Sequence, residues 1–265
     1  MNFCISNIAW NKNETSDVLK ILKRKKIKHL EYSPNLLLNN NFSKKKITSV
    51  RKYWKKEKIK LYSMQSILYK KKNALIFGKN YQKKIFLNEI KKKIIIAKNL
   101  GSKVIVFGSP ASRKTFNRKK KKLDQLSLEM FTKIAHQSKK HKVCFCLEAN
   151  PKIYKTKYLT HTSNSIDLVK KINNPYFKIN LDLGTVISNK ENYEAIIKKN
   201  LNYIGHVQVS SPHLKNLTNF KKKIDLFIKT LHNSGYKKVI SFEMLRNKKN
   251  NFKVIKKILE HTNNR

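Results

Sequence analysis

The stretch "IGHVQVSSP", residues 204–212, has the pattern of a buried β-strand that ends in polar side chains. Side chains alternate between the two faces of a strand, so His206, Gln208 and Ser210 share one face and two valines share the other. Turning an imidazole, an amide and a hydroxyl into a protein interior is costly unless they have partners. The stretch therefore predicts a strand that carries a functional site, with Gln208 as a candidate metal ligand.

Seven other short apolar stretches alternate along the chain with amphipathic, lysine-rich ones. We expect strands near residues 3–8, 27–32, 59–65, 103–108, 142–149, 177–183, 203–210 and 237–244. We expect helices near residues 14–25, 44–57, 82–99, 122–140, 164–172, 190–199, 218–233 and 250–261. Eight strands alternating with eight helices predict an α/β fold, a closed (βα)8 TIM barrel. The alternative, an open doubly wound sheet, normally begins with a glycine-rich phosphate turn, which the sequence after the first strand lacks.

Local signals divide the chain into these elements. Gly101 and Gly235 lie where helices should stop, and Ser163 and Asn189 lie where helices should start. Residues 111–122 are expected to form a flexible basic loop. Because the sequence shows no internal repeat or linker, we expect residues 1–265 to form one barrel domain.

The chain has 61 Lys and Arg residues against 15 Asp and Glu residues, a net charge of +46. Such a charge suggests a polyanionic partner such as nucleic acid or an anionic membrane. Only six of the basic residues are arginine, however, and the lysines are spread from end to end. We favour compositional drift over a dedicated binding patch, and we expect neither a nucleic acid nor a membrane as partner.

The three cysteines, Cys4, Cys144 and Cys146, do not have the spacing of a disulfide framework. They fit a reducing compartment. Cys144 and Cys146 share a strand face, and we interpret them as barrel-filling residues, with a thiolate metal site as the alternative. No apolar run approaches a membrane span and no secretory signal is recognisable, so the protein is expected in the cytoplasm.

The active site of such a barrel lies at the carboxyl ends of the strands. Four of the 15 acidic residues occupy apolar strand ends there: Glu31, Glu148, Asp182 and Glu243. Salt bridges to lysines would explain one such carboxylate more easily than four. Oxygen donors of this kind favour Mg²⁺ or Mn²⁺ over a thiolate-type zinc site. A glutamine oxygen can join them without adding charge, provided that its amide nitrogen finds another acceptor.

Four segments together resemble the xylose-isomerase-like barrels of the sugar phosphate isomerase/epimerase superfamily. They are "CLEANP" (146–151), "LDLG" (181–184), "IGHVQVSSPHL" (204–214) and "VISFEM" (239–244). Each motif is weak alone, but the four occur in order at the ends of the expected strands. The resemblance implies a divalent metal held by Glu148, Asp182, Gln208 and Glu243. A glutamine in place of the usual histidine is similar to the hydroxypyruvate isomerase branch.

The resemblance also implies an activity: isomerisation or epimerisation of a small sugar, sugar phosphate or hydroxy-keto acid. Glu148 and Glu243 would transfer a proton through an enediolate that the metal stabilises. The substrate contacts that we expect are Glu31, Gln65, Ser109, Arg113, His206 and Ser210. His206 could instead be a hydrogen-bonded core histidine, and Arg113 could be a solvated loop charge. Two departures from the family pattern, Thr185 and Ser211, bear on the substrate.

Two other functions stay open. An apurinic-site endonuclease would use the same barrel on DNA, but it needs extra histidines at the strand tips, whereas His136, His141 and His161 are expected in helices or loops. A non-catalytic barrel is the second alternative. The sequence also leaves open whether the protein forms a homo-oligomer.

Overall fold

The computed structural model describes residues 1–262, which form a closed barrel of eight parallel strands in sequence order. The strands are β1 (Asn2–Ser6), β2 (His29–Tyr32), β3 (Lys60–Met64), β4 (Val104–Phe107), β5 (Cys144–Glu148), β6 (Phe177–Asp182), β7 (Ile204–Val209) and β8 (Val239–Phe242). β8 pairs with β1 and closes the ring. The predicted TIM barrel is confirmed and the open sheet is excluded; the last three residues of the predicted domain lie outside the described residues.

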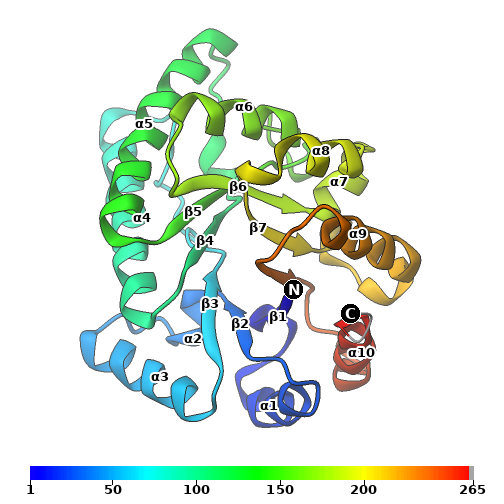
Figure 1. Ribbon diagram of the computed structural model, residues 1–265. Coiled ribbons are helices and arrows are strands. Elements are labelled where there is room, and N and C mark those ends of the chain that lie inside the picture. The colour runs from blue at the N-terminus through cyan, green and yellow to red at the C-terminus, as the bar shows by residue number, and fades with distance from the viewer. Residues whose placement is uncertain (263–265) are drawn as a thin grey trace.

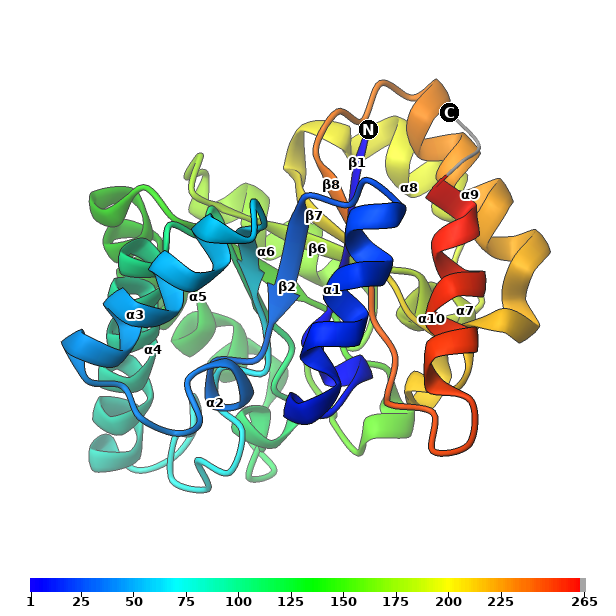
Figure 2. The same ribbon diagram turned by 90° about the horizontal axis from the view of Figure 1, so that it is seen from below.

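Helices surround the barrel, one long helix after each strand (Figure 1). They are α1 (Thr15–Arg24), α3 (Lys44–Lys56), α4 (Asn80–Leu100), α5 (Lys120–His141), α6 (Thr162–Ile172), α8 (Tyr193–Asn200), α9 (Lys221–Asn233) and α10 (Asn251–Ile258). The end of α10 lies at the same end of the barrel as the start of β1 (Figure 2). The opposite end, where the strands finish, holds the loops that build the site.

Short helices, absent from the sequence-based prediction, fill many of the connections. Two are α-helical, α2 (Pro34–Leu37) and α7 (Leu183–Asn189). The 3₁₀ helices are η1 (Asn7–Ala9), η2 (Lys12–Glu14), η3 (Pro110–Arg113), η4 (Lys152–Tyr154), η5 (Leu201–Tyr203), η6 (Pro212–Leu214), η7 (Leu217–Phe220) and η8 (Leu259–Thr262). The expected flexible loop at 111–122 is therefore helical at both ends, in η3 and in the first turn of α5.

The predicted helix stops are confirmed and the predicted starts are wrong. Gly101 directly follows α4 and Gly235 lies two residues past the end of α9, with positive φ angles of 85° and 82°. α6 begins at Thr162 rather than after Ser163. Asn189 ends α7 instead of starting a helix, and the next helix is capped by Asn192, whose side chain accepts from the backbone N–H of Ala195.

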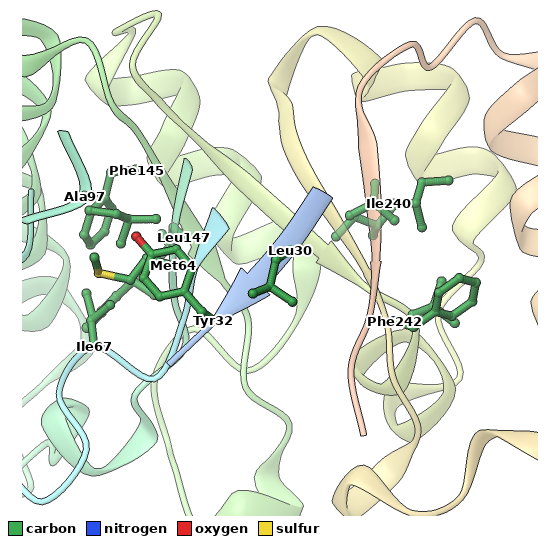
Figure 3. Close-up of a cluster of buried hydrophobic side chains, with 14 of the residues drawn as sticks. Leu30, Tyr32, Met64, Ile67, Ala97, Phe145, Leu147, Ile240 and Phe242 are labelled. Carbon is green, nitrogen blue, oxygen red and sulfur yellow. The ribbon is translucent and has the colours of Figure 1, made fainter. Parts of the chain in front are cut away.

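The strand side chains alternate between an outer apolar layer and a more polar barrel interior. Figure 3 shows members of the outer layer, among them Leu30, Tyr32, Ile240 and Phe242, which pack between strands and helices. Glu31, between Leu30 and Tyr32 in the sequence, faces the barrel interior. There it contacts side chains from β3, β7 and β8. The period-two pattern of the sequence thus separates the hydrophobic core from the polar interior.

The cysteines occupy the barrel interior. Cys146 is fully buried and packs with Val104 and Val106 in a small separate cluster, as a barrel-filling residue would. The sulfur atoms of Cys144 and Cys146 lie 3.7 Å apart, and all three cysteines are free thiols.

The surface carries the positive charge. Of the lysines in residues 1–262 only Lys93 is buried, with its ammonium 3.9 Å from the centre of the Phe42 ring. No helix in that part of the chain is both long enough and apolar enough to cross a membrane.

Gly205 lies where β7 packs closely against its neighbours. A Cβ atom there would come within 2.5 Å of the Cys146 sulfur and 2.6 Å of the Lys178 Cβ. Gly205→Ala is therefore expected to destabilise the fold by about 1–3 kcal/mol through overpacking. Urea unfolding measures the loss, and Cys146→Ala in the same chain should recover part of it. Wild-type stability in Gly205→Ala would contradict this packing.

Candidate active site

A cavity of about 210 Å³ opens at the carboxyl ends of the strands. Typical drug-sized sites measure roughly 300–1,000 Å³, so this one suits a small molecule. Its polar walls are Gln65, Ser66, Ser109, Glu148, Asn150, Tyr154, Asp182, Gln208, Ser210 and Glu243. All four predicted metal ligands line it, together with Gln65, Ser109 and Ser210 of the predicted substrate contacts. Glu31, Arg113 and His206 do not.

Glu148 is the last residue of β5. Its Oε1 accepts a hydrogen bond from Asn150 Nδ2 at 3.1 Å and its Oε2 accepts one from Asn180 Nδ2 at 2.9 Å. Burial, and after it the charge of Asp182, raises the pKa of Glu148 to about 8. Glu148 can therefore exchange a proton near neutral pH, which suits a general acid or base.

Asp182 ends β6 and caps the helix α7. Its Oδ2 accepts from the backbone N–H of Thr185 at 2.9 Å, and its Oδ1 accepts from the Ser210 hydroxyl at 2.6 Å. Burial raises the pKa of Asp182, although these hydrogen bonds oppose the shift. Because Asp182 pairs with Gln208 across the β6–β7 ladder, the two side chains are level.

Gln208 is buried on β7 and uses both ends of its amide. Nε2 donates to Glu31 Oε1 at 2.9 Å, and Oε1 accepts from Asn180 Nδ2 at 2.5 Å. Glu31 thus supplies the separate acceptor that the amide nitrogen needs when the Gln208 oxygen serves as a ligand.

Glu243 directly follows β8. Its side chain lines the cavity, and no side chain of residues 1–262 donates a hydrogen bond to it. Burial raises the pKa of Glu243 well above its usual value, and the charges of Glu31, Glu148 and Asp182 add to the shift. Repulsion among these carboxylates is thus a property of the site.

No basic side chain among the described residues lines the cavity, although the chain has 61 Lys and Arg residues. Three carboxylates and the glutamine face one small space without a cation from the protein. Their oxygen atoms form the donor set that hard divalent cations prefer, and a cation would relieve the repulsion. The oxygen donors of these four side chains therefore suit a divalent metal ion.

The four side chains lie farther apart than the ligands of a bound metal ion would. Within residues 1–262, no three His, Cys, Asp or Glu side chains lie close enough together to hold a metal ion. Instead, asparagine and serine side chains donate hydrogen bonds to the carboxylate oxygens of Glu148 and Asp182. Binding would therefore require side chains to move inward and both Glu148 and Glu243 to lose their protons.

Three predicted substrate contacts lie behind the cavity. Glu31 is fully buried, and His206 faces it with Nε2 2.9 Å from Glu31 Oε2. Burial raises the pKa of Glu31, but the hydrogen bond and charge of His206 and the bonds from Gln208 and Ser63 outweigh it, so the net shift is downward. His206 thus lies in the polar core, which was the alternative interpretation of this residue.

Arg113 is buried, so it is not a solvated loop charge. Its Nη2 donates to the backbone carbonyls of Phe107 at 3.1 Å and Glu148 at 2.7 Å. The guanidinium thereby ties the ends of β4 and β5 together behind Glu148. Burial lowers the pKa of Arg113 to about 10.

Sequence reasoning missed two asparagines that hold the carboxylates. Asn180 precedes Asp182 by two positions, so strand alternation alone could have placed it on the same face. Asn150 belongs to the quoted "CLEANP" segment. Tyr154 in η4, whose hydroxyl accepts from the backbone N–H of His213 at 3.0 Å, has no comparable signal in the sequence.

The histidines expected away from the strand tips are there. His136 and His141 belong to α5, and His161 caps α6.

Fold and cavity together define a (βα)8 barrel with a carboxylate-lined site at the carboxyl ends of its strands. The chain matches the family described as the xylose isomerase-like TIM barrel over residues 19–265. It belongs to this family, as the four sequence motifs predicted. No curated protein matches the sequence significantly.

Solved structures share the fold at low sequence identity. The 3-keto-D-glucoside 4-epimerase YcjR from E. coli aligns with a TM-score of 0.80 at 13% identity, over 99% of each chain. The IOLI protein with a binding zinc atom aligns with a TM-score of 0.75 at 14% identity, over 99% of this chain and 96% of its own. A family 2 AP endonuclease from Brucella melitensis aligns at 0.73 and 15%, over 95% and 96%. At these identities the likeness establishes the fold alone.

The raised pKa of Glu148 predicts a pH-dependent stability. Below about pH 4.5, its ordinary value, the carboxyl group is protonated in both states. Between there and about pH 8 the unfolded chain releases this proton while the folded chain keeps it. The free energy of unfolding should fall as pH rises, by up to about 1.4 kcal/mol per pH unit from this group.

Thermal unfolding of the chelator-treated protein between pH 5 and pH 8 measures the effect. Glu148→Gln, which cannot ionise, should flatten the decline. Glu129→Gln on the exposed face of α5 is the matched control and should keep it. Equal slopes for wild type and Glu148→Gln would contradict the assignment.

Proposed function

We propose that the protein is a divalent-metal-dependent isomerase or epimerase of a small sugar or related hydroxy-carbonyl compound. The observation that carries the proposal is the concentration of Glu148, Asp182, Glu243 and the Gln208 amide around a cavity lined by no described basic side chain. Family membership and the epimerase among the structural neighbours support it.

These four residues would hold the cation, with Mg²⁺ or Mn²⁺ the best match to an oxygen donor set. A bound cation would polarise the substrate carbonyl and stabilise negative charge on the enediolate. Glu148 and Glu243 come from β5 and β8, with two strands between them, so their carboxyl groups flank the cavity from different sides. One would remove the proton next to the carbonyl and the other would return one.

The cavity also narrows the substrate class. A phosphorylated sugar or a keto acid brings its own negative charge, for which the cavity lining offers no lysine or arginine. A neutral sugar meets hydroxyl and amide groups instead, from Ser109, Ser210 and Gln65. We therefore favour an uncharged sugar over a sugar phosphate or a hydroxy-keto acid.

The rival activity on DNA rests on the net charge of +46 and on the endonuclease among the structural neighbours. Nonspecific contacts between lysines and phosphates weaken steeply with salt. We expect any duplex binding to disappear at moderate salt, whether or not the duplex contains an apurinic site. Tight, salt-resistant binding of an apurinic duplex would favour the rival.

The activity itself is tested by proton exchange. Small ketoses and aldoses are incubated with the protein and Mn²⁺, Mg²⁺ or Zn²⁺ in D₂O, and deuterium incorporation is followed by proton NMR. Glu243→Gln should slow incorporation by about 10²–10⁴-fold, the usual contribution of a general base. Glu129→Gln should have the wild-type rate. If no sugar exchanges with any of the metals, the isomerase proposal fails and the non-catalytic barrel gains.

Gln208 is expected to contribute to metal affinity. Gln208→Ala should weaken Mn²⁺ binding at least about tenfold, because one of four donors is lost while the fold stays intact. Calorimetric titration with Mn²⁺ gives both affinities, and circular dichroism verifies the fold. Equal affinities would show that the glutamine is not a ligand.

A further inference from the structure

The side chain of Glu31 links four strands inside the barrel. It is fully buried on β2 and accepts hydrogen bonds from side chains of β3, β7 and β8. Oε2 takes Ser63 Oγ at 2.8 Å and faces His206 Nε2 at 2.9 Å. Oε1 accepts hydrogen bonds from Gln208 Nε2 at 2.9 Å and from Ser241 Oγ at 2.8 Å. Each oxygen thus has two partners, as its two lone pairs allow.

The bond to Gln208 matters because an amide has one donating and one accepting end. With Nε2 on Glu31, the oxygen of Gln208 accepts from Asn180, whose Nδ2 also donates to Glu148 at the cavity. Turning the amide over would place its oxygen against the Glu31 carboxylate and its NH₂ group against the NH₂ group of Asn180. Both contacts would be repulsive, so the two neighbours together define one orientation.

We propose that Glu31 is a positioning residue that orients the Gln208 amide, so that a neutral oxygen and not an NH₂ group faces the three carboxylates. Glu31 acts through Gln208 and does not touch the substrate, which replaces the role expected from the sequence. The orientation itself depends only on the contacts above. Its consequence for cation affinity rests on the proposed function.

The orientation can be measured without any metal. In nitrogen-labelled, chelator-treated protein, the side-chain NH₂ signals of Gln208 are assigned by their absence from Gln208→Ala. A hydrogen bond to a buried carboxylate should make these protons exchange slowly with solvent and shift them from the position of free glutamine. Glu31→Leu should abolish both properties, because the leucine side chain has no oxygen to accept the bond.

Ser63→Ala is the matched control, because it removes one donor to the other oxygen of Glu31 and leaves the Gln208 bond in place. It should lower stability without changing the Gln208 signals. If Glu31→Leu does not fold, Glu31→Asp keeps the charge but is one methylene too short to reach, and should give the same loss. Unchanged Gln208 signals in the folded Glu31 variant would overturn the proposal.

A double-mutant cycle tests the consequence for the cation. Glu31→Leu should weaken Mn²⁺ binding about tenfold in the wild-type background and clearly less in the Gln208→Ala background, where only the loss of the Glu31 charge acts on the cation. Equal, additive losses in the two backgrounds would overturn it. If the wild-type protein binds no Mn²⁺, the metal-dependent function fails, while the NMR experiment still decides the orienting role of Glu31.

Discussion

The pairing of β8 with β1 is the interaction on which the site depends. It turns eight strands that are far apart in sequence into a ring, so that residues as distant as Glu31 and Ser241 share one hydrogen bond. An open sheet would leave these side chains on separate edges. Closure also gives the strands an inside, where alternate residues leave the hydrophobic layer and meet one another. The polar interior and the cavity above it are both consequences of that geometry.

The charge of the cavity is opposite in sign to the net charge of the chain. Lysines cover the surface, yet the three carboxylates of the cavity have no basic neighbour in its described lining. Such a cluster costs free energy, and the raised pKa values of Glu148 and Glu243 express that cost. Structural salt bridges would have lowered these pKa values instead. A cluster kept at this cost is more typical of a functional site than of a stabilising one.

The strands and the residues at their ends could be predicted because both follow from the alternation of apolar and polar residues. Glu148, Asp182, Gln208 and Glu243 each follow from a strand register and meet at one cavity. Helix starts were harder to predict than strands, because several residues near the start of a helix can serve as its N-cap. α7 exists because Asp182 serves at once as a strand end and a helix cap. The burial of Arg113 depends on how η3 folds back, which no local pattern encodes.

The register of a strand also does not say how deep in the barrel an inward side chain lies. Glu31 and Glu148 look alike in sequence, but Glu31 lies in the interior with four partners and Glu148 lies at the cavity. This difference of depth explains the glutamine at position 208. An ionised carboxylate there would have opposed Glu31 directly and would have had no proton to donate to it. An amide satisfies Glu31 with its nitrogen and still offers an oxygen to the cavity. The glutamine thus meets the need of the buried carboxylate beneath it for a hydrogen-bond donor.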